Sequence, residues 1–205
     1  MKRIFVKYCG FTRKEDVDCA VSLGVDALGF IFYPGSKRYV TPETVRRITA
    51  DVPESVAKIG VFVNESPSHV NRVSDEAQLS MVQLFAQEVT SVDDFIIPVI
   101  RSYRISRSDD LPVADVGERI LLDTYTPHEA GGSGIPFDWA MLNGADIAGR
   151  AIVAGGITAD NVTTLLASVA PYGIDVSSGI ETEKGIKSPE KMKALMNNVE
   201  EFYGN

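Results

Sequence analysis

Eight short apolar runs are spread along the chain, and segments with helical patterning separate most of them. This alternation is typical of βαβ units around a parallel sheet. The predicted strands cover residues 4–8, 27–32, 59–63, 81–84, 99–102, 120–122, 151–154 and 174–176. Eight strands of this kind fit a closed (β/α)8 barrel, the TIM barrel. A doubly wound open sheet with eight strands is the alternative.

The predicted helices begin at recognisable signals. Pro42, Pro67 and Pro189 each follow a Thr or Ser, so a capping side chain precedes a proline at the first helical position. The predicted helices cover residues 14–23, 42–50, 67–77, 138–143, 160–169 and 189–202. The connections over residues 88–95 and 106–116 have weaker periodicity, and we expect short or irregular helices around the fourth and fifth units.

Size and charge limit the class of protein. The 205 residues are fewer than the ~250 usual for this barrel, so we expect a minimal barrel that forms one domain over residues 1–205. A net charge of −8 gives no basic field for nucleic acid or an acidic membrane surface. No segment approaches the ~20 apolar residues of a membrane span, and the N-terminus lacks the features of a signal peptide. We therefore expect a cytoplasmic protein.

The cysteines and histidines predict neither a disulfide nor a metal site. The two cysteines are Cys9, at a strand end, and Cys19, in a predicted helix. A structural disulfide is not expected in a chain without secretory features. No Cys and His cluster has the spacing of a zinc site, and neither histidine lies at a strand end.

Two consecutive βα turns near the C-terminus have the composition of a phosphate site. Gly155 and Gly156 follow one predicted strand, and Ser177, Ser178 and Gly179 follow the next. Glycine lets backbone amides approach an anion, serine adds donors, and a following helix adds partial positive charge. Either turn alone is also explained as a tight βα turn. The pair favours phosphate, because these loops commonly bind it in (β/α)8 barrels.

Reactive side chains are also expected at the strand ends. Cys9 ends the first strand and Asp123 follows the sixth. Lys7 shares the strand face of Cys9, where its charge would favour the thiolate. Cys9 could equally be a small core residue, and Asp123 or Asp175 could cap a turn. A carboxylate directly after an apolar strand nevertheless needs solvent, a partner or a function.

Two further loops add candidate contacts. Arg38 lies in a basic, aromatic-flanked segment over residues 34–39, and its guanidinium matches a carboxylate. An ordinary solvated loop is the alternative. Residues 126–134 form a long, glycine-rich segment of the kind used as a mobile flap.

Taken together, these residues resemble the phosphoribosylanthranilate isomerases of tryptophan biosynthesis, and the resemblance runs nearly end to end. The blocks that carry it are residues 6–10, 12–13, 24–33, 36–40, 60–64, 82–84, 122–123, 131–134, 137–139, 154–156 and 175–181. The chain departs from the family pattern at Tyr8, at Phe85-Ala86, where His-Gly is usual, and at Ile135.

The resemblance implies a cofactor-free Amadori rearrangement of N-(5'-phosphoribosyl)anthranilate. It implies Asp123 as the general acid, Cys9 as the general base, Arg38 as the partner of the anthranilate carboxylate and Asp175 as a further substrate contact. Lys7, which strand alternation places beneath the Cys9 thiol, is a further candidate for substrate binding. The turns containing Gly156, Ser178 and Gly179 would bind the substrate phosphate. The expected assembly is a monomer or homodimer. The alternatives are another sugar-phosphate isomerase on the same barrel and a catalytically silent phosphate-binding barrel.

Overall fold

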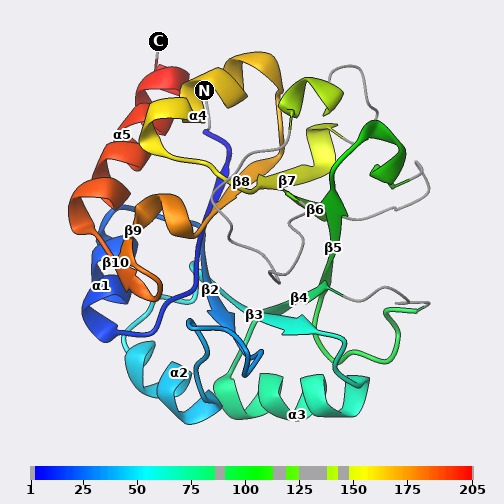
Figure 1. The fold of residues 1–205 in the computed structure, drawn as a ribbon. Coiled ribbons are helices and arrows are strands. Elements are labelled where there is room, and N and C mark those ends of the chain that lie inside the picture. The colour runs from blue at the N-terminus through cyan, green and yellow to red at the C-terminus, as the bar shows by residue number, and fades with distance from the viewer. Residues whose placement is uncertain (1–2, 86–90, 113–118, 125–137, 143–147, 205) are drawn as a thin grey trace.

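Eight parallel strands close into a barrel in chain order (Figure 1). The computed structural model describes residues 3–85, 91–112, 119–124, 138–142 and 148–204. The strands are β1 (Phe5–Cys9), β2 (Ala27–Ile31), β3 (Ala57–Val63), β4 (Met81–Phe85), β5 (Val99–Ile105), β6 (Ile120–Thr124), β7 (Ala151–Ala154) and β8 (Gly173–Val176). Because β8 also pairs with β1, the sheet has no open edge. The predicted (β/α)8 barrel is therefore confirmed, and the open sheet is excluded.

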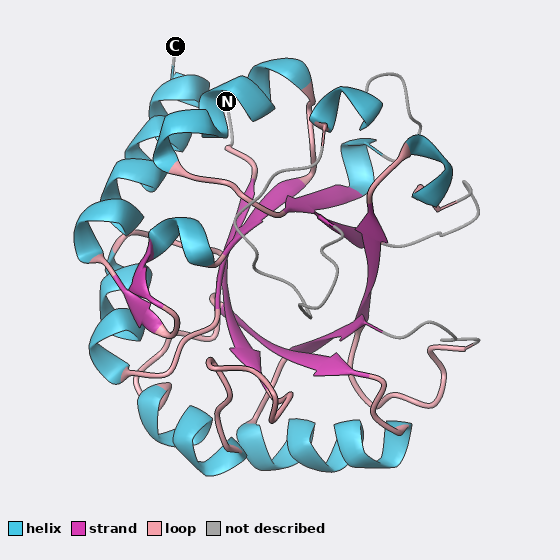
Figure 2. Cartoon of the chain, in the orientation of Figure 1, coloured by secondary structure: helices cyan, strands magenta, loops and turns pink. Residues whose placement is uncertain are grey.

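Helices cover the outside of the barrel unevenly (Figure 2). The α-helices are α1 (Lys14–Ser22), α2 (Pro42–Ile48), α3 (Pro67–Ala77), α4 (Ala159–Ser168) and α5 (Pro189–Gly204). The 3-10 helices are η1 (Ser108–Asp110), η2 (Trp139–Leu142), η3 (Ala148–Arg150) and η4 (Ser178–Ile180). The described residues after β4 and β5 hold no α-helix, in agreement with the expected irregularity of units four and five.

Two elements differ from the prediction. Where a helix was predicted over residues 138–143, the described residues 138–142 contain the 3-10 helix η2 and no α-helix. A short antiparallel hairpin, β9 (Glu181–Glu183) and β10 (Ile186–Lys187), follows η4 and was not predicted. Its two and three residues are too short to show strand alternation.

The predicted helix caps are present. Thr41 accepts a hydrogen bond from the Thr44 amide at 3.2 Å, and Ser66 accepts one from the His69 amide at 3.3 Å. Each cap satisfies an amide that the first helical turn leaves without an internal partner. No helix in the described part of the chain is long and apolar enough to cross a membrane.

Strand alternation sorts the side chains of β1 between the two sides of the barrel wall. Tyr8 points outward, and its hydroxyl donates to the Met192 carbonyl in α5 at 2.8 Å. Lys7 and Cys9 point inward, and Lys7 pairs in register with Ala27 of β2 and Asp175 of β8. The barrel thus carries an ammonium and a thiol on its inner face, as predicted, with a carboxylate on the neighbouring strand.

Candidate active site

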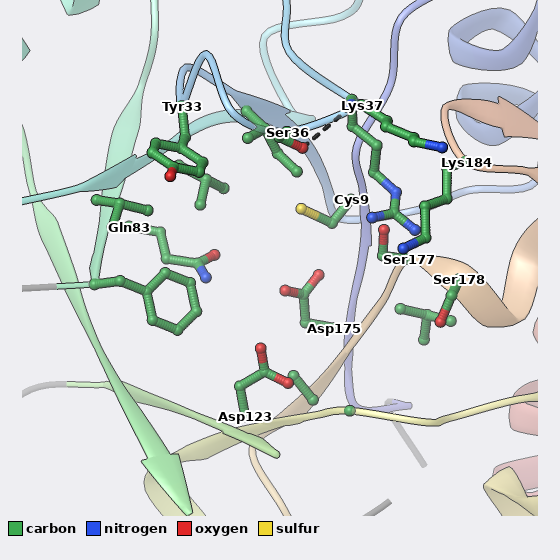
Figure 3. A pocket seen from close by; sticks show the side chains of 18 of the residues that line it. Cys9, Tyr33, Ser36, Lys37, Gln83, Asp123, Asp175, Ser177, Ser178 and Lys184 are labelled. Carbon is green, nitrogen blue, oxygen red and sulfur yellow. Dashed lines mark hydrogen bonds between the residues drawn. The ribbon is translucent and has the colours of Figure 1, made fainter. Parts of the chain in front are cut away.

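A pocket of about 350 Å³ opens at the C-terminal ends of the strands (Figure 3). The predicted site residues in its lining are Cys9, Arg38, Asp123, Gly155, Gly156, Asp175, Ser177 and Ser178. Lys7 lies beneath this lining, with its side chain fully buried. Gly179 adjoins the pocket in η4 but does not line it. The structure therefore brings nearly all the predicted residues to one place.

A buried ion pair joins Asp175 in the pocket lining to Lys7 beneath it. The Lys7 ammonium donates to Asp175 at 2.8 Å and to Gln83 at 3.0 Å. Burial opposes its charge, but Asp175 and Cys9 raise the pKa of Lys7 above its ordinary value. The second carboxylate oxygen of Asp175 is buried without a hydrogen-bond partner among the described residues. Asp175 therefore offers an acceptor to a donor group of a ligand.

The thiol of Cys9 lies next to this ion pair and is 6% exposed. Burial raises its pKa, and Lys7 opposes that effect through its charge and a hydrogen bond. The predicted influence of Lys7 thus has the expected sign. The net direction differs from the expectation, because the loss of solvent outweighs the nearby charge.

Asp123 has the properties of an acid. It is 7% exposed, and burial together with the charge of Asp175 raises its pKa to about 6. The Thr124 amide donates to it at 2.8 Å, and Arg104 on β5 also favours its ionised form. A carboxyl group with this pKa is partly protonated near neutral pH and can give its proton to a ligand.

The two predicted phosphate turns follow β7 and β8, which pair in register at Ala154 and Asp175. Gly155 and Gly156 adopt φ values of +90° and +65°. A β-carbon on Gly155 would meet the Thr124 hydroxyl at 2.1 Å, and one on Gly179 would meet the Ile157 carbonyl at 1.9 Å. The glycines are required here by backbone conformation and by close packing of the two turns.

Arg38 is buried rather than part of a solvated loop. Its guanidinium donates from Nε and Nη2 to the carboxylate of Glu181 at 2.9 and 2.7 Å. Burial opposes ionisation of Glu181, but Arg38 and Lys187 hold the pKa of this carboxyl below its ordinary value. Arg38 is thus at the pocket wall as predicted, and a protein carboxylate already orients it.

Several residues of the site were assigned no role from the sequence, although Gly29, Gln83 and Glu181 lie in the blocks that carry the resemblance. They are Gln83, which contacts Lys7, Gly29, beside Cys9, and Glu181 and Lys187, beneath the pocket wall. A β-carbon on Gly29 would lie 2.5 Å from the Cys9 sulfur. Glu181 and Lys187 are charged residues in the segment that follows the Ser177-Ser178-Gly179 turn, and their charges could have marked them as candidates. Because the hairpin of β9 and β10 was not predicted, nothing indicated that this segment folds back against the pocket wall.

The departure at Phe85 places an apolar ring in the pocket lining. Arg104 lies over this ring, 5.4 Å from its centroid. Tyr33, which follows β2, also lines the pocket and lies away from Ser177 and Ser178 (Figure 3), and Phe85 ends β4, two strands along the barrel from β2. The pocket therefore has an aromatic end and an end built from serine and glycine. Ala86, Ile135 and the segment over residues 126–134 lie outside the described residues.

Across the described ranges, no group of three or more His, Cys, Asp or Glu side chains is arranged to hold a metal ion.

Comparison with known proteins shows which family this chain is similar to. The family model for N-(5'phosphoribosyl)anthranilate (PRA) isomerase matches residues 6–198. The N-(5'-phosphoribosyl)anthranilate isomerase of Chromohalobacter salexigens is 40% identical, over 97% of this chain and 95% of the relative.

Two solved structures extend the likeness to the fold. One is that of phosphoribosyl anthranilate isomerase in complex with reduced 1-(o-carboxyphenylamino)-1-deoxyribulose 5-phosphate, with a TM-score of 0.82 and 34% identity. The other, of monomers generated from the dimeric Thermotoga maritima enzyme, has a TM-score of 0.83 and 34% identity. Both alignments cover 97% of this chain and 99% of the other. The chain belongs to the N-(5'-phosphoribosyl)anthranilate isomerase family.

Proposed function

We propose that Asp123 and Cys9 carry out the reaction of this isomerase of tryptophan biosynthesis. The reaction converts N-(5'-phosphoribosyl)anthranilate to 1-(2-carboxyphenylamino)-1-deoxyribulose 5-phosphate. One observation carries the proposal: a carboxyl group with a raised pKa and a thiol beside a buried ammonium line one pocket from different strands. Asp175 lies between them (Figure 3).

In the proposed first step, Asp123 gives its proton to the ring oxygen as the bond from that oxygen to C1' breaks. The nitrogen lone pair forms the C=N bond of an open-chain Schiff base. The Cys9 thiolate then removes the C2' proton, and the electrons of that C–H bond form an enolamine, which tautomerises to the aminoketone. The raised pKa of Asp123 suits the first transfer. The ammonium of Lys7 favours the thiolate needed for the second.

The two ends of the pocket suit the two ends of the substrate. We assign the phosphate to the turns containing Gly155 and Gly156 and, after β8, Ser177 to Gly179. The buried Ser177 hydroxyl has no hydrogen-bond partner among the described residues, so it can donate to a phosphate oxygen. The anthranilate ring then lies toward Tyr33 and Phe85. Gly156→Asp should sharply weaken substrate binding through its bulk and negative charge.

Arg38 is the proposed partner of the anthranilate carboxylate. A guanidinium has five donor N–H groups in a fixed plane, and Glu181 fixes the orientation of that plane. Removing a charge-assisted hydrogen bond costs roughly 1.5–3 kcal/mol. Arg38→Met should therefore raise KM by roughly tenfold or more, and an unchanged KM would place the carboxylate elsewhere.

Three broader assignments accompany this mechanism. We propose that residues 1–205 act as one domain, that the enzyme works in the cytoplasm, and that it is a monomer or a homodimer. A dimeric relative from which monomers were generated supports either assembly. Sedimentation equilibrium of the purified protein distinguishes them.

The matched pair of cysteines allows a direct test. The purified protein is mixed with fresh substrate, and the loss of substrate fluorescence is followed. Cys9→Ala should lower kcat by about 10²–10⁴-fold, the range for losing a positioned proton-transfer group. Cys19→Ala, which changes the other cysteine on α1, should keep the wild-type rate. Near-normal turnover in Cys9→Ala would refute the assignment of the base.

A further inference from the structure

The side chain of Lys187 is fully buried behind the pocket wall, at the end of β10. Its ammonium donates to the Cys9 carbonyl, to Glu181 at 2.9 Å and, at 3.4 Å, to the Ser177 carbonyl. An ammonium has three protons, and three acceptors surround this one. Lys187 therefore reaches the pocket through other residues and does not line it.

The three acceptors belong to three parts of the proposed site. The Cys9 carbonyl lies at the end of β1, in the residue that carries the thiol. The Ser177 carbonyl begins the turn after β8. Glu181 holds the guanidinium of Arg38 through two hydrogen bonds. One ammonium thus links the proposed base, the proposed phosphate turn and the proposed carboxylate partner.

The carbonyl of Cys9 lies at the end of β1, just before the Gly10 and Phe11 amides donate to the Gly29 carbonyl of β2. The register of β1 ends at Cys9 opposite Gly29 on one side, and at Tyr8 opposite Val176 on the other. Beyond this point Gly10 turns away with a φ of +86°. The bond from Lys187 fixes the backbone of Cys9 at this junction.

Lys187 is itself firmly held. Its backbone amide donates to Asp16 of α1 at 3.1 Å, and Asp16 also accepts two hydrogen bonds from Arg13. Gly185, in the turn of the hairpin, donates to Glu181 at 3.2 Å. The hairpin is thus a fixed support for the ammonium.

We propose that Lys187 is a positioning residue of the isomerase, which holds Cys9, the turn at Ser177 and, through Glu181, Arg38 in their reactive arrangement. The inference rests on the proposed role of Cys9 as the base. It predicts that loss of the Lys187 charge changes the reactivity of a thiol that Lys187 touches only through the backbone.

The charges around Cys9 set the direction of that change. Lys7 on its own strand and Lys187 on β10 lower the pKa of the thiol, whereas burial and Asp175 on β8 raise it. Burial also lowers the pKa of Lys187, and the charge of Glu181 opposes this. Removing the Lys187 charge should therefore raise the pKa of Cys9 and reduce the thiolate fraction at a given pH.

The test compares Lys187→Met and Lys187→Arg with Lys193→Met. The control removes the charge of an exposed lysine in α5. Each protein is treated with iodoacetamide over a range of pH, and alkylation of each cysteine is measured by mass spectrometry. Cys19 serves as an internal standard, because it lies on α1 and makes no contact with Lys187 in the hydrogen bonds described.

Lys187→Met should slow alkylation of Cys9 by about threefold or more at fixed pH, which corresponds to a rise of about half a unit in its pKa. The rate at Cys19 should not change. The acidic limb of the kcat/KM profile should move to higher pH by the same amount. Lys187→Arg, which keeps the charge, should restore both readouts at least in part, and Lys193→Met should match the wild type.

A wild-type alkylation profile in Lys187→Met would overturn the inference. If the methionine variant does not fold, Lys187→Gln keeps an amide donor without the charge and must give the same shift. The test is separate from that of the base. Full activity in Cys9→Ala would refute the proposed base, while slower alkylation in Lys187→Met would still support the positioning of Cys9.

Discussion

The two sides of the pocket hold their reactive groups by different means. On the side of β1 and β8, Cys9 lies against the ion pair of Lys7 and Asp175, with a second ammonium behind its carbonyl. On the side of β6, Asp123 has a hydrogen bond from the Thr124 amide, and otherwise its state is set mainly by burial. Burial is the largest influence on the pKa of both groups. Lys7 and Lys187 oppose it at the thiol, whereas the charge of Asp175 adds to it at the carboxyl group.

This difference corresponds to the two proposed roles. A base must lose its proton, so the buried thiol needs positive charge nearby. An acid must keep its proton, and burial with few compensating charges achieves that for a carboxyl group. The same exclusion of water therefore serves one group and opposes the other.

The largest expected effect comes from removing the acidic proton. Asp123→Asn keeps the shape of the side chain but has no proton to give to the ring oxygen. We expect kcat to fall by about 10²–10⁴-fold, with little change in the affinity for a reduced product analogue. Turnover kinetics and calorimetric binding of the analogue measure the two quantities. Equal loss of binding and turnover would mean that Asp123 binds the substrate rather than acting as its acid.

The same substitution should stabilise the protein at neutral pH. The folded-state pKa of Asp123 is about 6, above the ordinary 3.8, so its favourable contribution is complete below pH 3.8 and is lost as pH rises through 6. The free energy of unfolding of Asp123→Asn relative to wild type should increase by about 2 kcal/mol between about pH 4 and pH 7. Urea unfolding at several pH values checks this. A constant difference would show that the carboxyl group is not buried in solution.

Substitution of two glycines, one beside Cys9 and one beside Thr124, tests the effect of added bulk without a change of charge. Gly29→Ala places a methyl group against the Cys9 sulfur, and Gly155→Ala places one against the Thr124 hydroxyl at a φ of +90°. Each should lower the free energy of unfolding by about 1–3 kcal/mol through overpacking. Only Gly29→Ala should also slow alkylation of Cys9.

Gly149→Ala is the matched control, because a β-carbon there meets no atom within 4 Å. Thermal unfolding and iodoacetamide labelling provide the two measurements. Slower labelling in Gly155→Ala would show that the two sides of the pocket are coupled.

The smallest expected effect is that of removing the charge of Arg104, which lies over the ring of Phe85. Arg104 lowers the pKa of Asp123, so Arg104→Gln should raise it. Because the acid must be protonated, the alkaline limb of kcat/KM should move to higher pH by about a few tenths of a unit. A shift to lower pH would contradict the assigned sign.

The strands and the two phosphate turns could be predicted because each has a local signal. Residues 67–77 form the predicted helix without change, since Ser66 and Pro67 define its start and hydrophobic periodicity its length. Cys9 and Asp123 were predicted from their places at strand ends. The ammonium of Lys7 beside Cys9 was also predicted. The net rise in the pKa of Cys9 was not, because its burial depends on the closed barrel.

The hairpin of β9 and β10 shows where local reasoning ends. Its strands have three and two residues, and contacts to distant parts of the chain hold them. The bidentate pair of Arg38 and Glu181 joins residues 143 positions apart. No spacing rule connects such residues, and so Arg38 was predicted as a loop residue that meets only the substrate.

The register between β1 and β8 has a consequence for synthesis of the protein. Lys7 and Asp175 are 168 positions apart, and Lys187 and Cys9 are 178 positions apart. Closing a loop of that length is entropically costly and slow, and contacts of long sequence separation delay folding. On the ribosome, the first strand emerges with Lys7, which is buried in the folded protein. Its counter-ion Asp175 is made only with the eighth strand. Catalytic competence is therefore one of the last properties that the growing chain acquires.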